Sequence, residues 1–130
     1  MMKLVNVGNN KEYSEFIRNL RNHKEVKSGF IQQSHIEEKE HESHMTLYSY
    51  NYYVCIVEGK LAGYVGQIRD DIRVATHPDY QGKGIGKFMI NELMKIHPNC
   101  VAKVKIENKA SLNLFKSCGF REKYYILERE

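Results

Sequence analysis

Three glycines separated by single residues stand where a strand is expected to pass into a helix. They are Gly82, Gly84 and Gly86, and Lys83 and Lys87 add positive charge beside them. The first amides of a helix have no intrahelical partner and lie at the positive end of the helix dipole. Glycines let phosphate oxygens approach such amides without a Cβ in the way. The spacing therefore predicts a phosphate-binding segment.

Two familiar phosphate-binding loops do not fit this segment. A Walker A loop requires G-x-x-x-x-G-K-[ST], but Gln81 stands five positions before Gly86 and Phe88 follows Lys87. A Rossmann loop requires GxGxxG near the first strand of a βαβ unit, whereas this segment is GxGxG and lies well inside the chain. A tight turn without a ligand is the alternative, but three glycines and two lysines exceed what a turn requires.

Hydrophobic periodicity predicts the elements that position this segment. Strands are expected at residues 3–7, 52–57, 61–68, 72–76, 102–106 and 124–127, turns at 58–60 and 70–71, and helices that begin near residues 10, 34, 84 and 108. The predicted order is β-α-α-β-β-β-α-β-α-β. An antiparallel meander leads into one central β-α-β crossover, which predicts an α/β (α+β) fold with a mixed, mainly antiparallel sheet.

Individual residues mark the ends of these helices. Asn10 and Asn108 are predicted N-caps. Ser34 and Glu37 are predicted to form a capping box at the start of a mostly polar helix that continues to about residue 47. Gly119 and the phenylalanine after it are placed for a Schellman cap at the end of the last helix.

The composition fits one domain of ordinary size. The 130 residues are 42% hydrophobic and 28% charged, and no stretch approaches the roughly 18 apolar residues of a membrane span. The first residues lack the apolar region of a signal peptide. We therefore expect a single domain, residues 1–130, located in the cytoplasm and without a membrane partner.

The charge is compatible with two interpretations. A net charge of +4 suits a polyanionic ligand, or it merely keeps a small domain in solution. The chain has no combination of aromatic and basic residues of the kind found in RRM motifs, so we expect no nucleic-acid partner.

Cysteine and histidine spacing does not indicate a metal site. The three cysteines are widely spaced and form no CxxC pair, so neither a disulfide framework nor a zinc site is predicted. His41 and His44 lie three positions apart, but HESH is not HExxH and no third ligand is evident. A solvated helix face is the preferred interpretation of these histidines. Cys118 is interpreted as a packed residue rather than a nucleophile.

Two sequence blocks together resemble a known family. Residues 74–86 read VATHPDYQGKGIG and resemble the cofactor motif of the GNAT superfamily of N-acetyltransferases, in which the pattern is Gln/Arg-x-x-Gly-x-Gly/Ala. Residues 108–111 read NKAS and are followed by LF at 114–115 and CGF at 118–120, which is similar to the family's Asn-x-x-Ala/Ser…Gly-Phe segment. The resemblance covers residues 52–120 well and the N-terminal third more loosely.

The resemblance implies a GNAT-like (acyl-CoA N-acyltransferase) fold with acetyl-CoA as co-substrate and no metal. Amides of residues 81–87 would bind the pyrophosphate, and the backbone of residues 74–76 would pair with the pantetheine arm like an added strand. An amide of that strand would also stabilise the thioester oxygen. The residues implied to contact the cofactor are Val74, Ala75, Thr76, Gln81, Gly82, Lys83, Gly84, Ile85, Gly86, Lys87, Asn108, Ser111 and Phe115.

The implied reaction is direct attack of a primary amine on acetyl-CoA, which needs a base for the amine and an acid for the leaving thiolate. Asp70 stands about where histone-type members carry a glutamate base, and Tyr124 is a candidate acid. The alternatives are a hairpin turn for Asp70 and sheet packing for Tyr124. Phe115 and Lys103 replace the tyrosine and glutamate of ribosomal-protein alanine acetyltransferases, so the chain departs from that subfamily's catalytic pair.

The acceptor is less constrained than the donor. Residues 21–26 read RNHKEV and are similar to a run in one branch of the superfamily, which includes ribosomal-protein N-terminal acetyltransferases and acetyltransferases of nucleotide-linked amino sugars. The missing catalytic pair favours a small amine or a nucleotide-linked amino sugar. A peptide N-terminus or lysine, and a non-catalytic CoA-binding regulatory module, are the alternatives. After residue 120 there is room for one full strand, so we expect a homodimer that covers or completes the sheet edge.

Overall fold

A four-stranded antiparallel sheet forms the centre of the computed structural model, which describes residues 1–130. The strands are β1 (Met2–Asn6), β2 (Tyr52–Val57), β3 (Lys60–Ile68) and β4 (Asp71–Thr76), and they lie in the order β1-β2-β3-β4. Both predicted hairpin turns are confirmed. Glu58 and Gly59 have φ values of 49° and 78°, and Arg69 and Asp70 have values of 52° and 67°. Positive φ at both central residues is the requirement of a two-residue type I′ hairpin.

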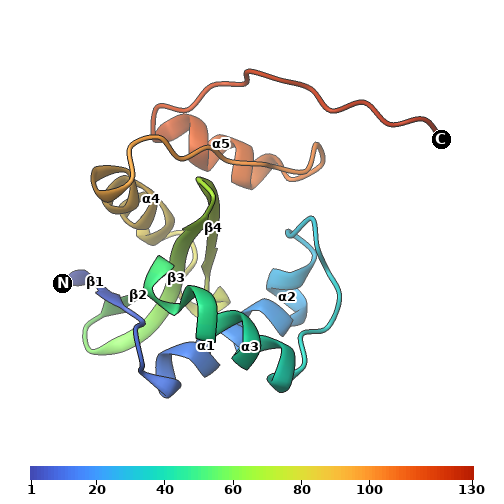
Figure 1. Ribbon diagram of the computed structural model, residues 1–130. Helices are drawn as coiled ribbons and strands as arrows, with labels where there is room; N and C mark the ends of the chain where they lie inside the picture. The colour runs from blue at the N-terminus through green and yellow to red at the C-terminus, as the bar shows by residue number, and fades with distance from the viewer.

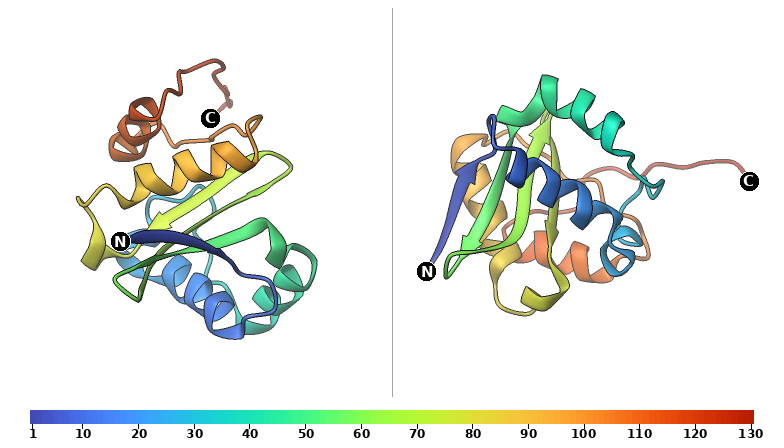
Figure 2. Two further views of the ribbon diagram at one scale, coloured as in Figure 1. Left: turned by 90° about the vertical axis from the view of Figure 1, so that its left-hand side faces the viewer. Right: turned by 90° about the horizontal axis from the view of Figure 1, so that it is seen from below.

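Helices cover both faces of this sheet (Figures 1 and 2). The helices are α1 (Lys11–Asn22), α2 (Lys24–Lys27), α3 (Glu38–Tyr48), α4 (Ile85–Ile96) and α5 (Lys109–Ser117), with 3-10 turns η1 (Ser49–Asn51) and η2 (Pro78–Tyr80). In the left view of Figure 2, α4 lies on one side of the strands and α1 and α3 lie on the other. No helix in the chain combines the length and the apolar character that crossing a bilayer requires.

Alternating side chains of the strands supply a separate core to each helical layer. Cys55 and Val65 pack with Met89 and Leu93 of α4 on one face. Val54 and Tyr64, their immediate neighbours in the strands, pack with Ile17 and Leu20 of α1 on the other. The large side chains that are fully buried include Tyr52 and Tyr64 of the sheet, Ile17 of α1, and Ile85, Met89, Ile90 and Leu93 of α4. Because successive strand residues face opposite sides, this sheet fixes which residues can face each helical layer.

Both predicted asparagine caps are confirmed. The Asn10 Oδ1 atom accepts a hydrogen bond of 3.0 Å from the Tyr13 amide at the start of α1. The Asn108 Oδ1 atom accepts an equivalent bond of 3.0 Å from the Ser111 amide at the start of α5. Each bond satisfies one of the amides that a helix start leaves without a partner.

The Schellman cap of α5 is also confirmed. Gly119 has a φ of 93°, and its amide donates to the Lys116 carbonyl over 3.0 Å. The Phe120 amide donates to the Phe115 carbonyl over 3.1 Å, and the two phenyl rings meet edge to face with centroids 5.2 Å apart. This pair of backbone bonds and the accompanying apolar contact define the motif.

The predicted capping box is wrong. α3 begins at Glu38, and its N-cap Glu37 makes no side-chain capping bond. The Ile36 amide instead donates to the Asn22 side chain over 2.8 Å, and the Ile36 carbonyl accepts from the same side chain over 2.9 Å. A long-range amide clamp from the end of α1 therefore replaces the local cap, and the residues before Glu38 remain outside the helix.

The predicted strand at residues 102–106 is not formed. Only Val101 meets the sheet, through a single parallel bridge to Asp71, with the Ile72 amide donating to the Val101 carbonyl over 2.9 Å. Ala102 and Val104 still pack against the core cluster beside α4, whereas Ile106, the third apolar residue of the predicted strand, is exposed. The segment diverges from β4 after one bridge, and without a paired neighbour no ladder exists. The mixed helix-and-sheet class is as predicted, but the parallel part of the sheet is reduced to this contact.

The predicted strand at residues 124–127 is likewise absent. Tyr124 and Leu127 are 81% and 91% exposed, and the chain after α5 runs across the molecule without joining the sheet (Figure 1). A strand needs a neighbouring strand for its backbone groups. The diverging segment after Val101 offers no paired edge to receive it.

Candidate active site

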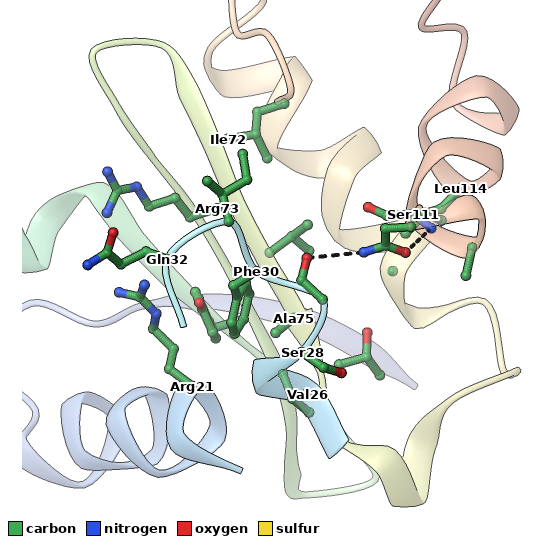
Figure 3. Close-up of a pocket in the computed structure, with 18 of the residues that line it drawn as sticks. Arg21, Val26, Ser28, Phe30, Gln32, Ile72, Arg73, Ala75, Ser111 and Leu114 are labelled. Carbon is green, nitrogen blue, oxygen red and sulfur yellow. Dashed lines mark hydrogen bonds between the residues drawn. The ribbon is translucent and has the colours of Figure 1, made fainter. Parts of the chain in front are cut away.

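An open cavity of about 1120 Å³ lies beside the free edge of β4. Its walls come from β4, the start of α4, α5 and the connection between α2 and α3 (Figure 3). A volume of this size exceeds a usual small-molecule pocket and can hold an elongated ligand together with a second molecule.

The start of α4 presents free backbone donors to this cavity. Gly84 is the N-cap, and no side chain caps the helix. The first intrahelical bond runs from the Phe88 amide to the Gly84 carbonyl over 3.1 Å, so the amides of residues 84–87 precede the regular ladder. The positive end of the helix dipole lies at the same place. These amides can therefore bind an anionic phosphate group.

The three glycines of this segment are required for different reasons. Gly82 and Gly84 have φ values of 77° and 78°, and an added Cβ would meet no atom within 4 Å at either position. Their backbone conformation favours glycine, and the space beside them is open. A Cβ at Gly86 would lie 2.9 Å from Leu114 Cδ2. Gly86 therefore allows α5 to approach α4 closely, which differs from the purely phosphate-binding role expected for it.

The outer edge of β4 offers backbone groups to the same cavity. Ile72 directs its amide away from β3, toward Val101. Alternation along a strand points the backbone groups of Val74 and Thr76 in the same outward direction. Beyond the bridge at Val101 no neighbouring strand occupies this edge. An extended ligand can therefore pair with β4 between Val74 and Thr76.

A contact across the cavity joins α5 to the connection after α2. The Asn108 Nδ2 atom donates to the Gly29 carbonyl over 3.1 Å, and the Lys105 Nζ atom donates to the Ser28 carbonyl over 3.2 Å. Asn108 thus caps α5 with its oxygen and holds residues 28–29 with its nitrogen. Figure 3 draws both bonds of this amide, between α5 and the neighbouring loop.

Almost all residues expected to contact the cofactor line this one cavity. They are Val74, Ala75, Thr76, Gln81, Gly82, Gly84, Ile85, Gly86, Lys87, Asn108, Ser111 and Phe115. Lys83 is the exception, since it does not line the cavity, and its ammonium group lies 5.6 Å from the centroid of the Tyr80 ring, which does. Only Lys87 of the two predicted lysines adds charge to the cavity wall.

The two expected catalytic residues are not brought to the cavity. Asp70 lies exposed in the turn between β3 and β4, where its amide donates to Gln67 Oε1 over 3.0 Å. Tyr124 lies in the exposed C-terminal segment, with the Lys123 ammonium 5.5 Å from its ring centroid. Asp70 therefore lies in a hairpin turn, which was the alternative interpretation of this residue. Asp71, one residue further on, does line the cavity.

Further polar residues line the half of the cavity that lies away from the glycines, and no sequence motif predicted that they belong to a site. Arg21, Gln32 and Arg73 line it, together with the Phe30 ring. Arg21 belongs to the run RNHKEV noted above, and Arg73 shares its strand face with Ala75. The alternation of residues 72–76 could have predicted which face of the strand carries Arg73. Periodicity cannot show that the end of α1 lies opposite this face.

The two histidines of α3 line the cavity and are held by different partners. His41 is buried, and its Nε2 atom lies 2.7 Å from the Ser14 carbonyl oxygen. His44 Nε2 lies 2.9 Å from the Tyr52 hydroxyl. Burial, reinforced by the charge of Arg73, lowers the pKa of His44 from 6.5 to about 4, so its ring is neutral near pH 7. The expectation of a solvated helix face is therefore wrong, because α3 turns both rings toward the protein.

No group of three or more histidine, cysteine, aspartate or glutamate side chains is placed to hold a metal ion. The three cysteines are free, and Cys118 packs partly buried against the core cluster below α4, as expected for a structural residue.

Comparison with known proteins places these features in a family. The family model described as acetyltransferase (GNAT) family matches residues 15–120. An L-amino acid N-acyltransferase of Escherichia coli is 40% identical over 52 residues, covering 36% of this chain and 30% of the relative. An uncharacterized N-acetyltransferase of Methanocaldococcus jannaschii is 29% identical over 89 residues, covering 55% of this chain and 39% of the relative. The chain thus spans about a third of the length of these curated relatives.

The fold is similar to that of a solved enzyme. The crystal structure of spermidine N-acetyltransferase from Vibrio cholerae, in complex with CoA and spermine, superimposes with a TM-score of 0.79 at 20% identity. The match covers 98% of this chain and 85% of that one. Because the family model spans most of the sequence and the fold agrees with it, the chain belongs to the acetyltransferase (GNAT) family.

Proposed function

We propose that this chain transfers an acetyl group from acetyl-CoA to a primary amine. One observation carries the proposal. The uncapped amides at the start of α4 and the free edge of β4 line the same cavity, so a single elongated ligand can contact both. Acetyl-CoA has the required form, with a pyrophosphate at one end of an extended amide-containing arm. The CoA in the Vibrio cholerae structure and the family membership support this choice.

Different residues of the cavity would bind different parts of acetyl-CoA. Amides of residues 84–87 and the Lys87 ammonium would hold the pyrophosphate. The outward backbone groups of Val74 and Thr76 would pair with the pantetheine amides. Acetyl-CoA supplies the thioester. The amine nitrogen bonds to the acetyl carbon as the carbon–sulfur bond breaks, and the proton lost by the amine balances the one that the leaving thiolate gains.

For the acceptor we propose a small amine or a nucleotide-linked amino sugar. Phe115 and Lys103 stand at the positions where the peptide-type enzymes carry a catalytic tyrosine and glutamate. Phe115 is buried against Phe120 and Lys103 lies at the cavity wall, and neither side chain can perform the role of the residue that it replaces. The name of the Escherichia coli relative supports a small acceptor, since it describes an enzyme that acts on L-amino acids. Acetylation of a peptide N-terminus or lysine, and CoA binding without catalysis, remain the alternatives. We further propose that residues 1–130 work as one cytoplasmic domain, consistent with the free cysteines.

The test combines cofactor binding with turnover. Release of free thiol from acetyl-CoA is measured with a panel of small amines, nucleotide-linked amino sugars and a short peptide. Lys87→Gln should weaken CoA binding about 3- to 10-fold, because one cation beside the phosphates is lost. Lys95→Gln is the matched control, since Lys95 lies near the other end of α4 with its side chain 74% exposed. CoA binding without transfer to any amine would support the regulatory module instead, and no CoA binding would contradict both.

A further inference from the structure

Two arginines in the remote half of the cavity have no acidic partner. Arg21 lies in the last turn of α1 and Arg73 lies in the middle of β4. Neither takes part in any of the ion pairs of the molecule. The Arg21 Nε atom is buried and has no hydrogen-bond partner. A buried donor on a charged group is normally satisfied, so this atom indicates a missing acceptor.

The two guanidinium groups approach one region from opposite walls. Arg21 Cζ lies 5.4 Å from the centroid of the Phe30 ring, a stacking contact that restricts its movement. Burial raises the pKa of the Tyr52 hydroxyl, and the charges of Arg73 and Arg21 together with a hydrogen bond from Arg73 act against this increase. Both guanidinium groups therefore lie near the same hydroxyl group. Figure 3 shows Arg21, Arg73 and Gln32 gathered at one end of the cavity, away from Ser111 and Leu114.

The other charged groups of the cavity do not neutralise these arginines. Glu25, Glu40 and Asp71 line the walls, but none forms an ion pair with either guanidinium. Lys103 and the histidines of α3 also face this space. His44 is neutral near pH 7, as described above. Arg73 also lies within hydrogen-bonding reach of the Tyr52 hydroxyl. Neither guanidinium group has an acidic partner, and the planar arrangement of its N–H donors matches carboxylate and phosphate oxygens.

We infer that the acceptor is an amine that carries an anionic group, a carboxylate or a phosphate, which Arg21 and Arg73 bind while Gln32 adds an amide contact. This inference rests on the proposed function, because it treats the remote half of the cavity as the acceptor site. The anion would be held away from the free edge of β4, and the amine would face the thioester end. A polycation such as spermidine would be disfavoured by the same two charges.

The test measures binding and transfer separately. Protein saturated with CoA is titrated calorimetrically with L-amino acids and their carboxamides, with UDP-linked 4-amino sugars and the free amino sugars, and with spermidine. An amino acid differs from its carboxamide only by the anionic group, whereas a UDP-linked sugar differs from the free sugar by the whole UDP group, so loss of binding on substitution of the arginines identifies the contribution of its phosphates. Arg21→Gln and Arg73→Gln should each weaken binding of the member that carries a carboxylate or phosphate about tenfold or more, and leave binding of the member without that group unchanged. Arg21→Lys keeps the charge but lacks the Nε donor, and should recover only part of the affinity.

The control substitution is Arg129→Gln, in the exposed C-terminal segment. Unchanged CoA affinity in the Arg21 and Arg73 variants would show that they fold. Preference for amino acids assigns a carboxylate, preference for UDP-linked sugars assigns a phosphate, and either result supports the inference. Equal binding within each pair, tighter binding of spermidine, no binding of any amine, or affinity that survives both substitutions would overturn it. Anion binding that depends on both arginines without any acetyl transfer would keep the site and refute the proposed enzyme.

Discussion

His44 shows how the fold changes the chemistry of a single residue. Its ring lies between α3 and the sheet, where burial lowers its pKa from 6.5 to about 4. In the unfolded chain the ring regains its ordinary pKa. Above pH 6.5 the ring is neutral in both states, so it contributes no pH dependence there. Between pH 6.5 and 4 only the unfolded chain takes up the proton, and the folded state loses stability as the pH falls.

Replacement of His44 by glutamine should remove this pH dependence. Between pH 6.5 and 4, the wild type should lose on the order of 2 kcal/mol more of its unfolding free energy than His44→Gln, allowing for partial exposure of the ring. Glutamine can still bond the Tyr52 hydroxyl that His44 contacts. Urea unfolding at several pH values measures the difference. Parallel stability curves for the two proteins would show that His44 keeps its ordinary pKa in the folded chain.

At the same scale, residue types predicted a phosphate-binding segment at residues 82–87, but they did not show what each residue of the segment contacts. The alternation of glycine and charge in residues 82–87 was sufficient to indicate a phosphate site at a helix start. Gly86 also leaves room for the side chain of Leu114 in α5, and this contact depends on how α4 and α5 pack. Lys83 and Lys87 both flank the glycines in the sequence, yet only Lys87 lines the cavity, while the Lys83 ammonium group lies over the Tyr80 ring.

The elements around the cavity are joined by the side chain of Asn108. Its oxygen caps α5 and its nitrogen holds the Gly29 carbonyl, so one residue couples a helix start to the loop that closes one wall. Asn10 caps α1 through a bond of the same length but forms no such cross-cavity contact, and it therefore serves as a matched control.

Asn108→Ala and Asn10→Ala should each lower the unfolding free energy by about 1 kcal/mol through loss of the cap. Only Asn108→Ala should also accelerate hydrogen exchange in residues 28–36, because only this variant releases the loop from α5. Asn108→Ser should restore the cap but not the contact with Gly29, since serine is shorter. Equal exchange in this loop for both alanine variants would refute the coupling.

At the scale of elements, the two predicted strands that are not formed show that a local residue pattern does not by itself decide whether a strand forms. Residues 102–106 alternate as a strand should, and Ala102 and Val104 do face the core. Strand formation also needs a partner along the whole backbone, and β4 departs from this segment after Val101. That divergence leaves the edge of β4 free and opens the cavity. The missing ladder and the proposed cofactor site are thus two results of one backbone geometry.

For the molecule as a whole, the exposed C-terminal segment is an apolar surface that a partner chain could cover. Tyr124, Tyr125, Ile126 and Leu127 are between 78% and 91% exposed. They follow one another in a residue composition typical of strands, and the backbone beside Val101 is unpaired beyond its single bridge. We propose that a second copy of the chain covers this segment in a homodimer.

Sedimentation should therefore detect a dimer, and Ile126→Asp should convert it to a monomer. The substitution should leave the melting temperature of the monomer unchanged, because Ile126 makes no core contact within one chain. Glu128→Gln, at another exposed position of the same segment, is the control. A wild-type chain that sediments as a monomer at high concentration would contradict this proposal.

Local sequence was sufficient for the features that depend on a few neighbouring residues. The asparagine caps of α1 and α5, the Schellman cap, the two hairpins and the turn into α4 at the glycine segment were correctly located, because each is specified by residues within about one turn of one another. The capping box predicted at residues 34–37 was wrong, because Ile36 pairs with the distant Asn22 side chain instead. The family follows from two such blocks. Side-chain and backbone partners far apart in the chain decided the rest. The clamp of Ile36 by Asn22, the divergence after Val101, and the meeting of Arg21 with Arg73 all join segments that periodicity treats separately. The proposed cofactor-binding part of the cavity could therefore be predicted from the sequence, whereas the proposed acceptor part depends on the tertiary structure, which brings Arg21 of α1 and Arg73 of β4 to one cavity.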